Sequence, residues 1–362
     1  MKSIKVVEVF LGNARVGRLA LTEDGLGAFE YDAGYLTTGI SISPFELPLK
    51  NGVMFAKRTP FDGNFGVFDD CLPDGWGSLL LDRYLQKQGI NPRKLSILDK
   101  LSFVGSTGRG ALEFRPDRSV MNNEETINFE HLASETEKIL RSDTYQGDSI
   151  ESLYKQGGSP GGARPKIVVK YEGKDWLVKF RATTDPASIG KTEYKYSVLA
   201  KQCGLEMPET RLFEAKFFGV ERFDRTPNGK LHVVSVAGLL NADYRIPCLD
   251  YLNIFQLCQA LTHNVQEMWK LYRLMVFNFL IGNKDDHAKN FAFILRDNNW
   301  YLAPAFDILP GSGINGYHTT SINDSITPSK EDLFTVAEKA GLERNKAIDI
   351  FNETEKRLVI SD

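Results

Sequence analysis

The chain has 362 residues, of which 42% are apolar, 25% charged and 11% aromatic. This is the composition of a folded globular protein and excludes disorder as its main state. The 44 Lys and Arg against 47 Asp and Glu give a net charge of −3, too balanced for a protein whose whole surface wraps nucleic acid. We find neither an apolar run long enough to span a membrane nor a signal peptide, so we expect a cytoplasmic protein.

The four cysteines lie far apart in the sequence and show no spacing typical of a zinc site. They are Cys71, Cys203, Cys248 and Cys258. We therefore predict reduced thiols in the hydrophobic core.

Residues 1–50 are predicted to be mainly β. Val6–Phe10 and Arg15–Leu21 alternate in polarity around Gly12-Asn13, which is typical of a hairpin. Gly25–Tyr31 and Gly39–Ser43 continue this alternation and are predicted as further strands.

Further along the chain, helical patterns become more frequent. Trp76–Gln88 is predicted as a helix with Asp74 as its N-cap, and a second helical segment precedes the loop Gly105-Ser-Thr-Gly-Arg-Gly110. Residues 129–152 are also predicted to be mostly helical. The remaining predicted elements are the strands Ile167–Tyr171, Trp176–Phe180, Thr210–Ala215 and Phe218–Phe223, the helices Thr192–Cys203 and Glu267–Ile281, and the hairpin Ala292–Leu295 with Trp300–Ala303.

The strongest chemical motif is Asn283-Lys-Asp-Asp-His-Ala-Lys-Asn290, followed by Ala305-Phe306-Asp307. An Asp, an Asn five positions later and a second Asp beyond a short hairpin is an arrangement that phosphotransferases use. In it Asp285 accepts the proton of the acceptor hydroxyl, while Asn290 and Asp307 supply the oxygen ligands that Mg²⁺ prefers. We expect Asp307 at the end of an apolar strand. A polar loop capping a helix and a metallohydrolase fragment remain alternatives.

A glycine-rich stretch, Gly157-Gly-Ser-Pro-Gly-Gly-Ala-Arg-Pro-Lys166, precedes the first of two predicted strands. Its backbone N–H groups could cradle phosphates, and Lys179 in the second strand would face the nucleotide, as the strand lysine of kinases does. The candidate nucleotide-binding residues are therefore Ser159, Gly161, Gly162, Ala163, Lys166 and Lys179, with Glu193 as the helix partner of Lys179. The alternative for Lys179 is an outward-facing lysine on a half-exposed strand.

Two further motifs require interpretation. Ile189-Gly-Lys-Thr192 resembles the end of a P-loop, but Asp185 occupies the position of the required first glycine and would repel a phosphate. Val220-Glu-Arg-Phe-Asp-Arg225 is predicted as a strand running into a turn. Its arginines could meet an acidic loop of the large lobe or form a structural ion pair.

Taken in order, four blocks of this sequence resemble the HipA family of bacterial serine/threonine protein kinases from toxin–antitoxin modules. They are Gly161-Gly-Ala-Arg-Pro-Lys166, Val220-Glu-Arg-Phe-Asp-Arg225, Asp285-Asp-His-Ala-Lys-Asn-Phe291 and Ala305-Phe-Asp-Ile-Leu-Pro310. The resemblance implies an α+β, bilobal, protein-kinase-like fold with a small β-rich N-terminal subdomain. We assign residues 1–120 to that subdomain, 121–248 to the kinase N-lobe with the glycine-rich loop, and 249–362 to the helical C-lobe.

The resemblance also implies residue roles. Asp285 is the catalytic base, Asn290 and Asp307 are the Mg²⁺ ligands, and Lys179 contacts the phosphates of ATP. His287 would buttress the catalytic loop. Ser159 falls on the serine that the family autophosphorylates, and a phosphate there would repel the phosphates of ATP.

The cofactors implied are ATP and Mg²⁺. The family's protein targets include aminoacyl-tRNA synthetases, and its partner is a helix-turn-helix antitoxin of HipB type that binds operator DNA. We expect this chain to reach DNA only through such a partner. Two other interpretations remain open, a small-molecule kinase on the same scaffold and a catalytically inactive interaction or corepressor module.

Overall fold

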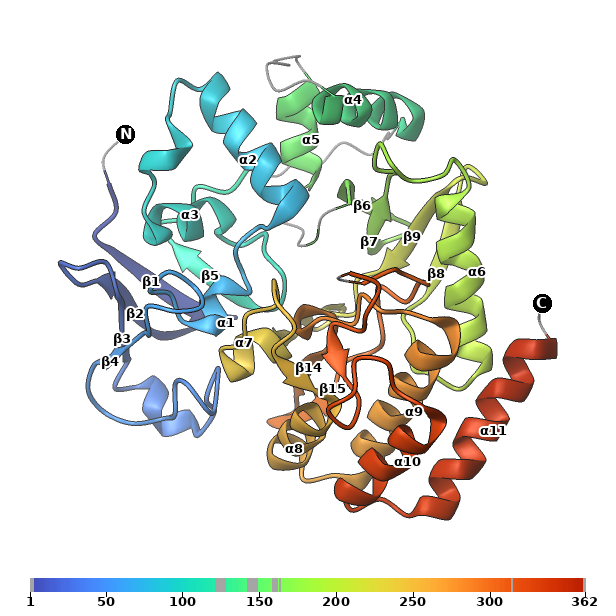
Figure 1. Ribbon diagram of the computed structural model, residues 1–362. Coiled ribbons are helices and arrows are strands. Elements are labelled where there is room, and N and C mark those ends of the chain that lie inside the picture. The colour runs from blue at the N-terminus through green and yellow to red at the C-terminus, as the bar shows by residue number, and fades with distance from the viewer. Residues whose placement is uncertain are drawn as a thin grey trace. The chain divides into compact units, whose positions relative to one another are not determined.

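The computed structural model describes residues 3–120, 128–141, 149–157, 162, 164–313 and 315–360. It divides into two compact units (Figure 1). The N-terminal unit comprises Met1–Lys191 and Thr210–His232, and the C-terminal unit comprises Thr192–Glu209 and Val233–Asp362. The three predicted segments, with boundaries at residues 120 and 248, are smaller than these units, and their boundaries stay a prediction. Among the described residues, no helix has both the length and the apolar character that crossing a bilayer requires.

The N-terminal unit begins with a five-stranded sheet of order β4-β3-β2-β1-β5. Its strands are β1 Val6–Leu11, β2 Ala14–Leu21, β3 Gly27–Tyr31, β4 Met54–Phe55 and β5 Leu112–Arg115. The predicted hairpin around Gly12-Asn13 is confirmed, with Leu11 paired to Ala14. The predicted strand Gly39–Ser43 is wrong. A short 3-10 helix, Tyr35–Thr38, ends at Gly39 in the left-handed region, and Ser43 forms only an isolated bridge.

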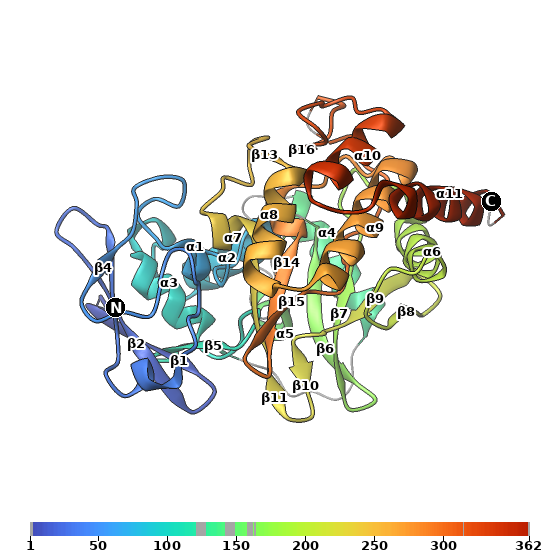
Figure 2. The ribbon, with the colours of Figure 1, turned by 90° about the horizontal axis from the view of Figure 1, so that it is seen from below.

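Helices and a second sheet complete this unit. The helices are α1 Gly66–Asp69, α2 Gly75–Lys87, α3 Ile97–Val104, α4 Phe129–Arg141 and α5 Ser149–Gly157. The sheet has the order β6-β7-β9-β8, and its strands are β6 Lys166–Tyr171, β7 Lys174–Lys179, β8 Thr210–Phe213 and β9 Phe217–Glu221. A short ribbon of β10 Arg225–Thr226 and β11 Gly229–Lys230 follows. α5 lies beside β6 (Figure 2).

One face of this second sheet forms the hydrophobic core that the unit shares with its helices. Ile167 and Val178 are buried there against Trp76 and Leu80 of α2 and Leu153 of α5. Because side chains alternate across a strand, the neighbouring residues of β6 and β7 project from the opposite face. This alternation decides where the two candidate lysines lie.

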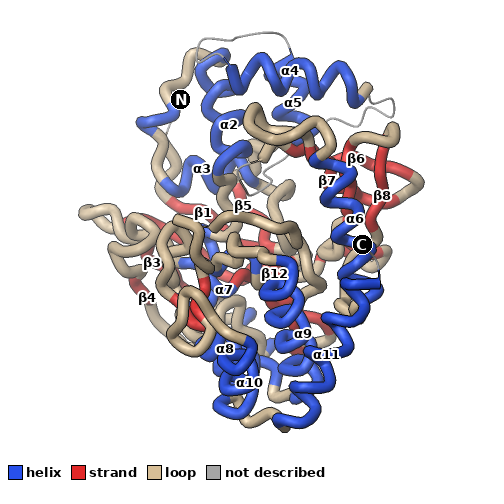
Figure 3. The backbone as a smooth tube through the Cα atoms, turned by 45° about the vertical axis from the view of Figure 1, so that its right-hand side comes forward, coloured by secondary structure: helices blue, strands red, loops and turns tan. Residues whose placement is uncertain are grey.

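The C-terminal unit is mainly helical, as the colouring by secondary structure shows (Figure 3). Its helices are α7 Val236–Leu240, α8 Tyr251–Thr262, α9 Val265–Ile281, α10 Lys330–Lys339 and α11 Arg344–Ile360. Its strands are β13 Leu249–Asp250, β14 Ala292–Arg296, β15 Asn299–Leu302 and β16 Thr320–Ser321. α6 Ile189–Gln202 begins in the N-terminal unit and β12 His232–Ser235 crosses the division, and both continue into this one. The predicted α+β class is confirmed.

The cysteines fit the prediction in three cases of four. Cys71, Cys203 and Cys258 are buried and unbridged. Cys248 is exposed, so the prediction of a core thiol is wrong there. It lies in the loop before β13, where its Sγ donates to the backbone oxygen of Asp243 at 3.3 Å.

Candidate functional site

The segment from Asn283 to Asn290 connects the buried helix α9 to the strand β14 in the C-terminal unit. α9 ends because Gly282 adopts a left-handed φ of 67°. The side chain of Asp285 is exposed in this loop. Across five residues, the Asn290 amide nitrogen donates to the backbone oxygen of Asp285 at 2.7 Å. This bond fixes the two predicted site residues relative to each other, and the carboxamide oxygen of Asn290 is the atom of this side chain that could bind a metal ion.

The next carboxylate, Asp286, has the opposite environment and is only 1% exposed. Its Oδ1 accepts from the backbone N–H groups of Thr319 and Thr320 at 2.9 and 3.2 Å. Its Oδ2 lies 2.9 Å from Nδ1 of His318 and accepts from the Tyr251 hydroxyl at 3.2 Å. Of two adjacent acids, therefore, Asp285 is exposed and Asp286 is enclosed by hydrogen-bond partners.

Burial, followed by the nearby charge of Asp286, raises the pKa of Tyr251 well above its usual value. The phenol therefore stays protonated and remains a donor. Sequence analysis did not identify Tyr251, His318, Thr319 or Thr320 as part of the site. No local signal could have done so, because these partners lie more than 30 positions from Asp286 in the sequence.

His287 has a local structural contact. Its Nδ1 accepts from the backbone N–H of Lys289 at 3.2 Å and so caps the short 3-10 helix Ala288–Asn290. Its ring centroid lies 6.0 Å from that of Tyr244. This geometry agrees with the buttressing role, which stays a prediction.

Asp307 does not end a strand, contrary to our expectation. β15 ends at Leu302, and Asp307 lies in an irregular segment with a φ of 53° and an exposed side chain. Aspartate tolerates this left-handed region better than most residues, at a cost on the order of 1 kcal/mol. Four residues later the chain returns to the candidate loop, where Gly311 forms a parallel bridge with Asn283. The segment that carries Asp307 therefore meets the loop that carries Asn290, and both lie in the C-terminal unit. Both side chains offer oxygen ligands suited to Mg²⁺.

Lys179 and Lys166 lie directly opposite each other in the antiparallel pair of β6 and β7. They project from the sheet face opposite the helical core and are 8% and 4% exposed. Nζ of Lys179 lies 5.5 Å from the ring centroid of Phe218. The alternative of a solvent-facing Lys179 is therefore wrong. Two neighbouring lysine side chains of this kind are suited to donate to the oxygens of one polyphosphate.

The described part of the glycine-rich stretch reaches this lysine pair. Gly162 has a φ of 94°, in the region that favours glycine, and a Cβ there would lie 2.5 Å from Nζ of Lys166. Its N–H donates to Asp74 Oδ1, and its backbone oxygen accepts from the N–H of Trp76 at 3.2 Å. Asp74 occupies the N-cap position of α2 but makes no side-chain cap, contrary to prediction, because its carboxylate binds Gly162.

Some predicted residues cannot be compared with the structure. Ser159, Gly161 and Ala163 lie outside the described residues. Glu193 lies in α6, is 6% exposed and belongs to the C-terminal unit. Its pairing with Lys179 stays a prediction.

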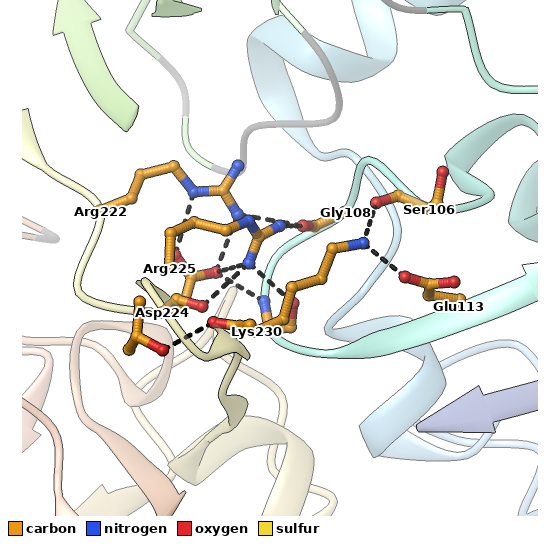
Figure 4. Close-up of polar contacts among 10 residues, drawn as sticks. Ser106, Gly108, Glu113, Arg222, Asp224, Arg225 and Lys230 are labelled. Carbon is orange, nitrogen blue, oxygen red and sulfur yellow. Dashed lines mark hydrogen bonds and ion pairs between the residues drawn. The ribbon is translucent and has the colours of Figure 1, made fainter. Parts of the chain in front are cut away.

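The arginines of the Val220–Arg225 motif form a structural cluster (Figure 4). Arg222 donates to both carboxylate oxygens of Asp224 at 3.0 and 2.8 Å, and Arg225 donates to Oδ2 at 2.9 Å. Both guanidinium groups also donate to the backbone oxygen of Gly108. All these partners lie within the N-terminal unit. Of the two interpretations, the described contacts are those of the structural ion pair.

Two stretches of the chain match models of known protein families. Residues 7–115 match the HipA N-terminal domain, and residues 158–360, more than half of the chain, match the HipA-like C-terminal domain. The chain belongs to the HipA family. This membership was predicted from the sequence and is confirmed.

Two relatives of this HipA-family chain are named as a kinase and as a toxin. A Sinorhizobium fredii protein, Y4dM, named as a candidate kinase, is 26% identical over 99% of this chain and 91% of its own length. The Escherichia coli protein named Toxin YjjJ is 27% identical over 47% of this chain and 41% of its own.

A solved structure shares the fold. HipA of Shewanella oneidensis, determined in complex with HipB and its operator DNA, superposes with a TM-score of 0.74 at 20% identity. The superposition covers 98% of this chain and 89% of that one. The HipA-like fold predicted from the sequence is thereby confirmed.

Proposed function

We propose that this chain is an ATP- and Mg²⁺-dependent serine/threonine protein kinase. The observation that carries the proposal is the pairing of an exposed Asp285 with Asn290, whose side-chain amide is bonded to the Asp285 backbone 2.7 Å away. A phosphotransferase needs a base at the acceptor hydroxyl and an oxygen ligand for the metal at a fixed distance from it. The kinase names of relatives support the same activity.

The chemistry assigned to the chain's own residues is simple. Asp285 takes the proton of the serine or threonine hydroxyl while the hydroxyl oxygen bonds to the γ-phosphorus of ATP. The bond between the γ-phosphorus and the β–γ bridging oxygen breaks, and ADP leaves. Lys166 and Lys179 hold phosphate oxygens through charge-assisted hydrogen bonds. Asn290 and Asp307 would hold Mg²⁺, which supplies neutralisation of the phosphate charge when bound.

Labelled ATP tests the catalytic assignment. With Mg²⁺, the unaltered chain should transfer the label to itself or to a protein acceptor, and Asp285→Asn should abolish this transfer while binding Mg·ATP normally. Asp297→Asn, which alters an exposed carboxylate in the turn between β14 and β15, is the matched control and should transfer at the wild-type rate. Transfer by Asp285→Asn would remove Asp285 as the base, and failure of the unaltered chain to bind ATP would overturn the kinase proposal.

The biological role we propose is that of a toxin neutralised by a helix-turn-helix antitoxin of HipB type. The toxin name of one relative and the HipB complex of the structural neighbour support this role. An aminoacyl-tRNA synthetase is the proposed class of target, and Ser159 is the proposed site of autophosphorylation. Growth arrest on expression, relieved by the antitoxin and absent for Asp285→Asn, is the expected result. Mass spectrometry of residues 155–170 tests Ser159.

The same labelling assay separates the rival functions. Transfer to small alcohols or amines with none to protein would favour a small-molecule kinase. Antitoxin binding without ATP binding would favour an inactive interaction module.

A further inference from the structure

The exposed candidate base Asp285 is held from both sides by one residue, Thr319. On the preceding side, the backbone oxygen of Lys284 accepts from the Thr319 N–H at 3.1 Å and from its hydroxyl at 3.0 Å. On the following side, the Asp286 carboxylate accepts from the same Thr319 N–H at 2.9 Å. The two neighbours of Asp285 are therefore fixed to a single point on a segment more than 30 residues away.

The carboxylate of Asp286 extends this attachment into the interior of the unit. It is bonded to His318 and Tyr251, both at most 5% exposed. The Tyr251 hydroxyl in turn accepts from the side-chain amide of Asn278 in α9 at 3.1 Å. Asn278 Oδ1 then accepts from the amide of Asn283 at 3.0 Å. The chain of bonds returns to the loop at Asn283, two residues before Asp285, so the loop is attached on both sides of Asp285.

Packing around Lys284 leaves the loop little room to shift. A Cβ on Gly313 would lie 2.6 Å from the backbone oxygen of Lys284 and 2.0 Å from that of Tyr317. Nζ of Lys284 donates to the backbone oxygen of Gly316 at 2.8 Å. Lys284, the residue before Asp285, is thus in contact with the same segment that carries His318 and Thr319.

We propose that Asp286 and Thr319 are positioning residues, which set the place of Asp285 at the acceptor hydroxyl without touching the substrate. The inference rests on the proposed kinase function and adds to it what holds the reacting acid in place. Misplacing a reacting group by about 1 Å can lower the rate on the order of 100-fold. Loss of this attachment should therefore lower kcat more than it lowers the affinity for Mg·ATP.

Two variants test the proposal. Thr319→Val removes the hydroxyl bond to Lys284 at nearly constant volume and should lower kcat about 10-fold, with Thr319→Ser restoring it. Asp286→Asn keeps one oxygen for the amides of residues 319 and 320 and should lower kcat about 10- to 100-fold. In both, the KM for ATP should stay within about threefold of wild type. Asp332→Asn, which disrupts the capping box of α10, is the control that lowers stability without lowering kcat.

One readout separates this inference from the proposed function. Hydrogen exchange, which needs no catalysis, should rise in residues 283–290 of Thr319→Val. Wild-type kcat in both variants, or unchanged exchange, would overturn the inference while leaving the kinase proposal standing. Absence of transfer by the unaltered chain would overturn both.

Discussion

The carboxylate of Asp224 accepts a hydrogen bond from the backbone N–H of Gly110, which lies 114 positions earlier in the chain, at 2.8 Å. The loop before β5 is thereby joined to the segment that follows β9. Lys230 strengthens this junction by donating to the backbone oxygen of Ser106 and to the carboxylate of Glu113, both at 2.6 Å (Figure 4). The first sheet of the N-terminal unit and the sheet that carries Lys179 are therefore linked by buried and part-buried polar contacts.

Replacing Asp224 with Asn should destabilise the N-terminal unit by about 3 kcal/mol, because two guanidinium side chains that are only 14% and 15% exposed would lose their counter-charge. Burial alone would raise the pKa of Asp224, but Arg222 and then Arg225 hold it below its usual value. The carboxylate is thus charged at neutral pH. Urea unfolding followed by tryptophan fluorescence measures the loss. Asp243→Asn, which removes the partner of the half-exposed Arg245, should cost less than about 0.5 kcal/mol. Equal losses in the two variants would contradict the prediction.

His232 should make the N-terminal unit less stable in mild acid. Its Nε2 lies 2.8 Å from the backbone oxygen of Ile42, and burial lowers the pKa of the ring to about 4 from 6.5. As the pH falls below 6.5, the His232 ring of the unfolded chain becomes protonated, whereas the ring of the folded chain stays neutral until the pH nears 4. The free energy of unfolding should therefore fall between pH 6.5 and 4, by about 3 kcal/mol in total.

Urea midpoints measured across this pH range test the prediction. His232→Gln should flatten the dependence, whereas His131→Gln, which changes an exposed histidine of α4, should leave it as steep as in wild type. An unaltered slope in His232→Gln would assign the acid sensitivity to other groups.

Lys179→Met should weaken the binding of Mg·ATP at least about 10-fold, because a charge-assisted bond to phosphate is lost from a site little exposed to water. Isothermal titration calorimetry measures the change. Lys170→Met is the matched control, since Lys170 lies on β6 with an exposed side chain. Its affinity should equal that of wild type. Unchanged affinity in Lys179→Met would remove this lysine from the nucleotide site.

Of the four cysteines, only Cys248 should react rapidly with a thiol reagent in the folded protein. Cys71, Cys203 and Cys258 are buried, and burial raises the pKa of Cys258 to about 12. Counting the thiols modified before and after adding urea checks this. Cys248→Ser should lose the rapid phase, and a second rapid thiol would show that the core opens easily.

The sequence by itself determined the elements whose signals are local. The hairpin around Gly12-Asn13 and the helix α9 follow from polarity alternation, turn residues and apolar periodicity within a few positions of each other. The five-residue spacing of Asp285 and Asn290 is local too, and the structure joins these two residues by a hydrogen bond. The family could be recognised because such short motifs recur in a fixed order.

Only the tertiary structure decided which partners distant residues find. It enclosed Asp286 while leaving its neighbour Asp285 exposed, because donors from residues 318–320 and from Tyr251 converge on one of the two carboxylates. It also directed Asp74 to Gly162 rather than to the start of α2. A buried carboxylate must find hydrogen-bond donors wherever the packed chain provides them, and no pattern of neighbouring residues records which distant segment that will be.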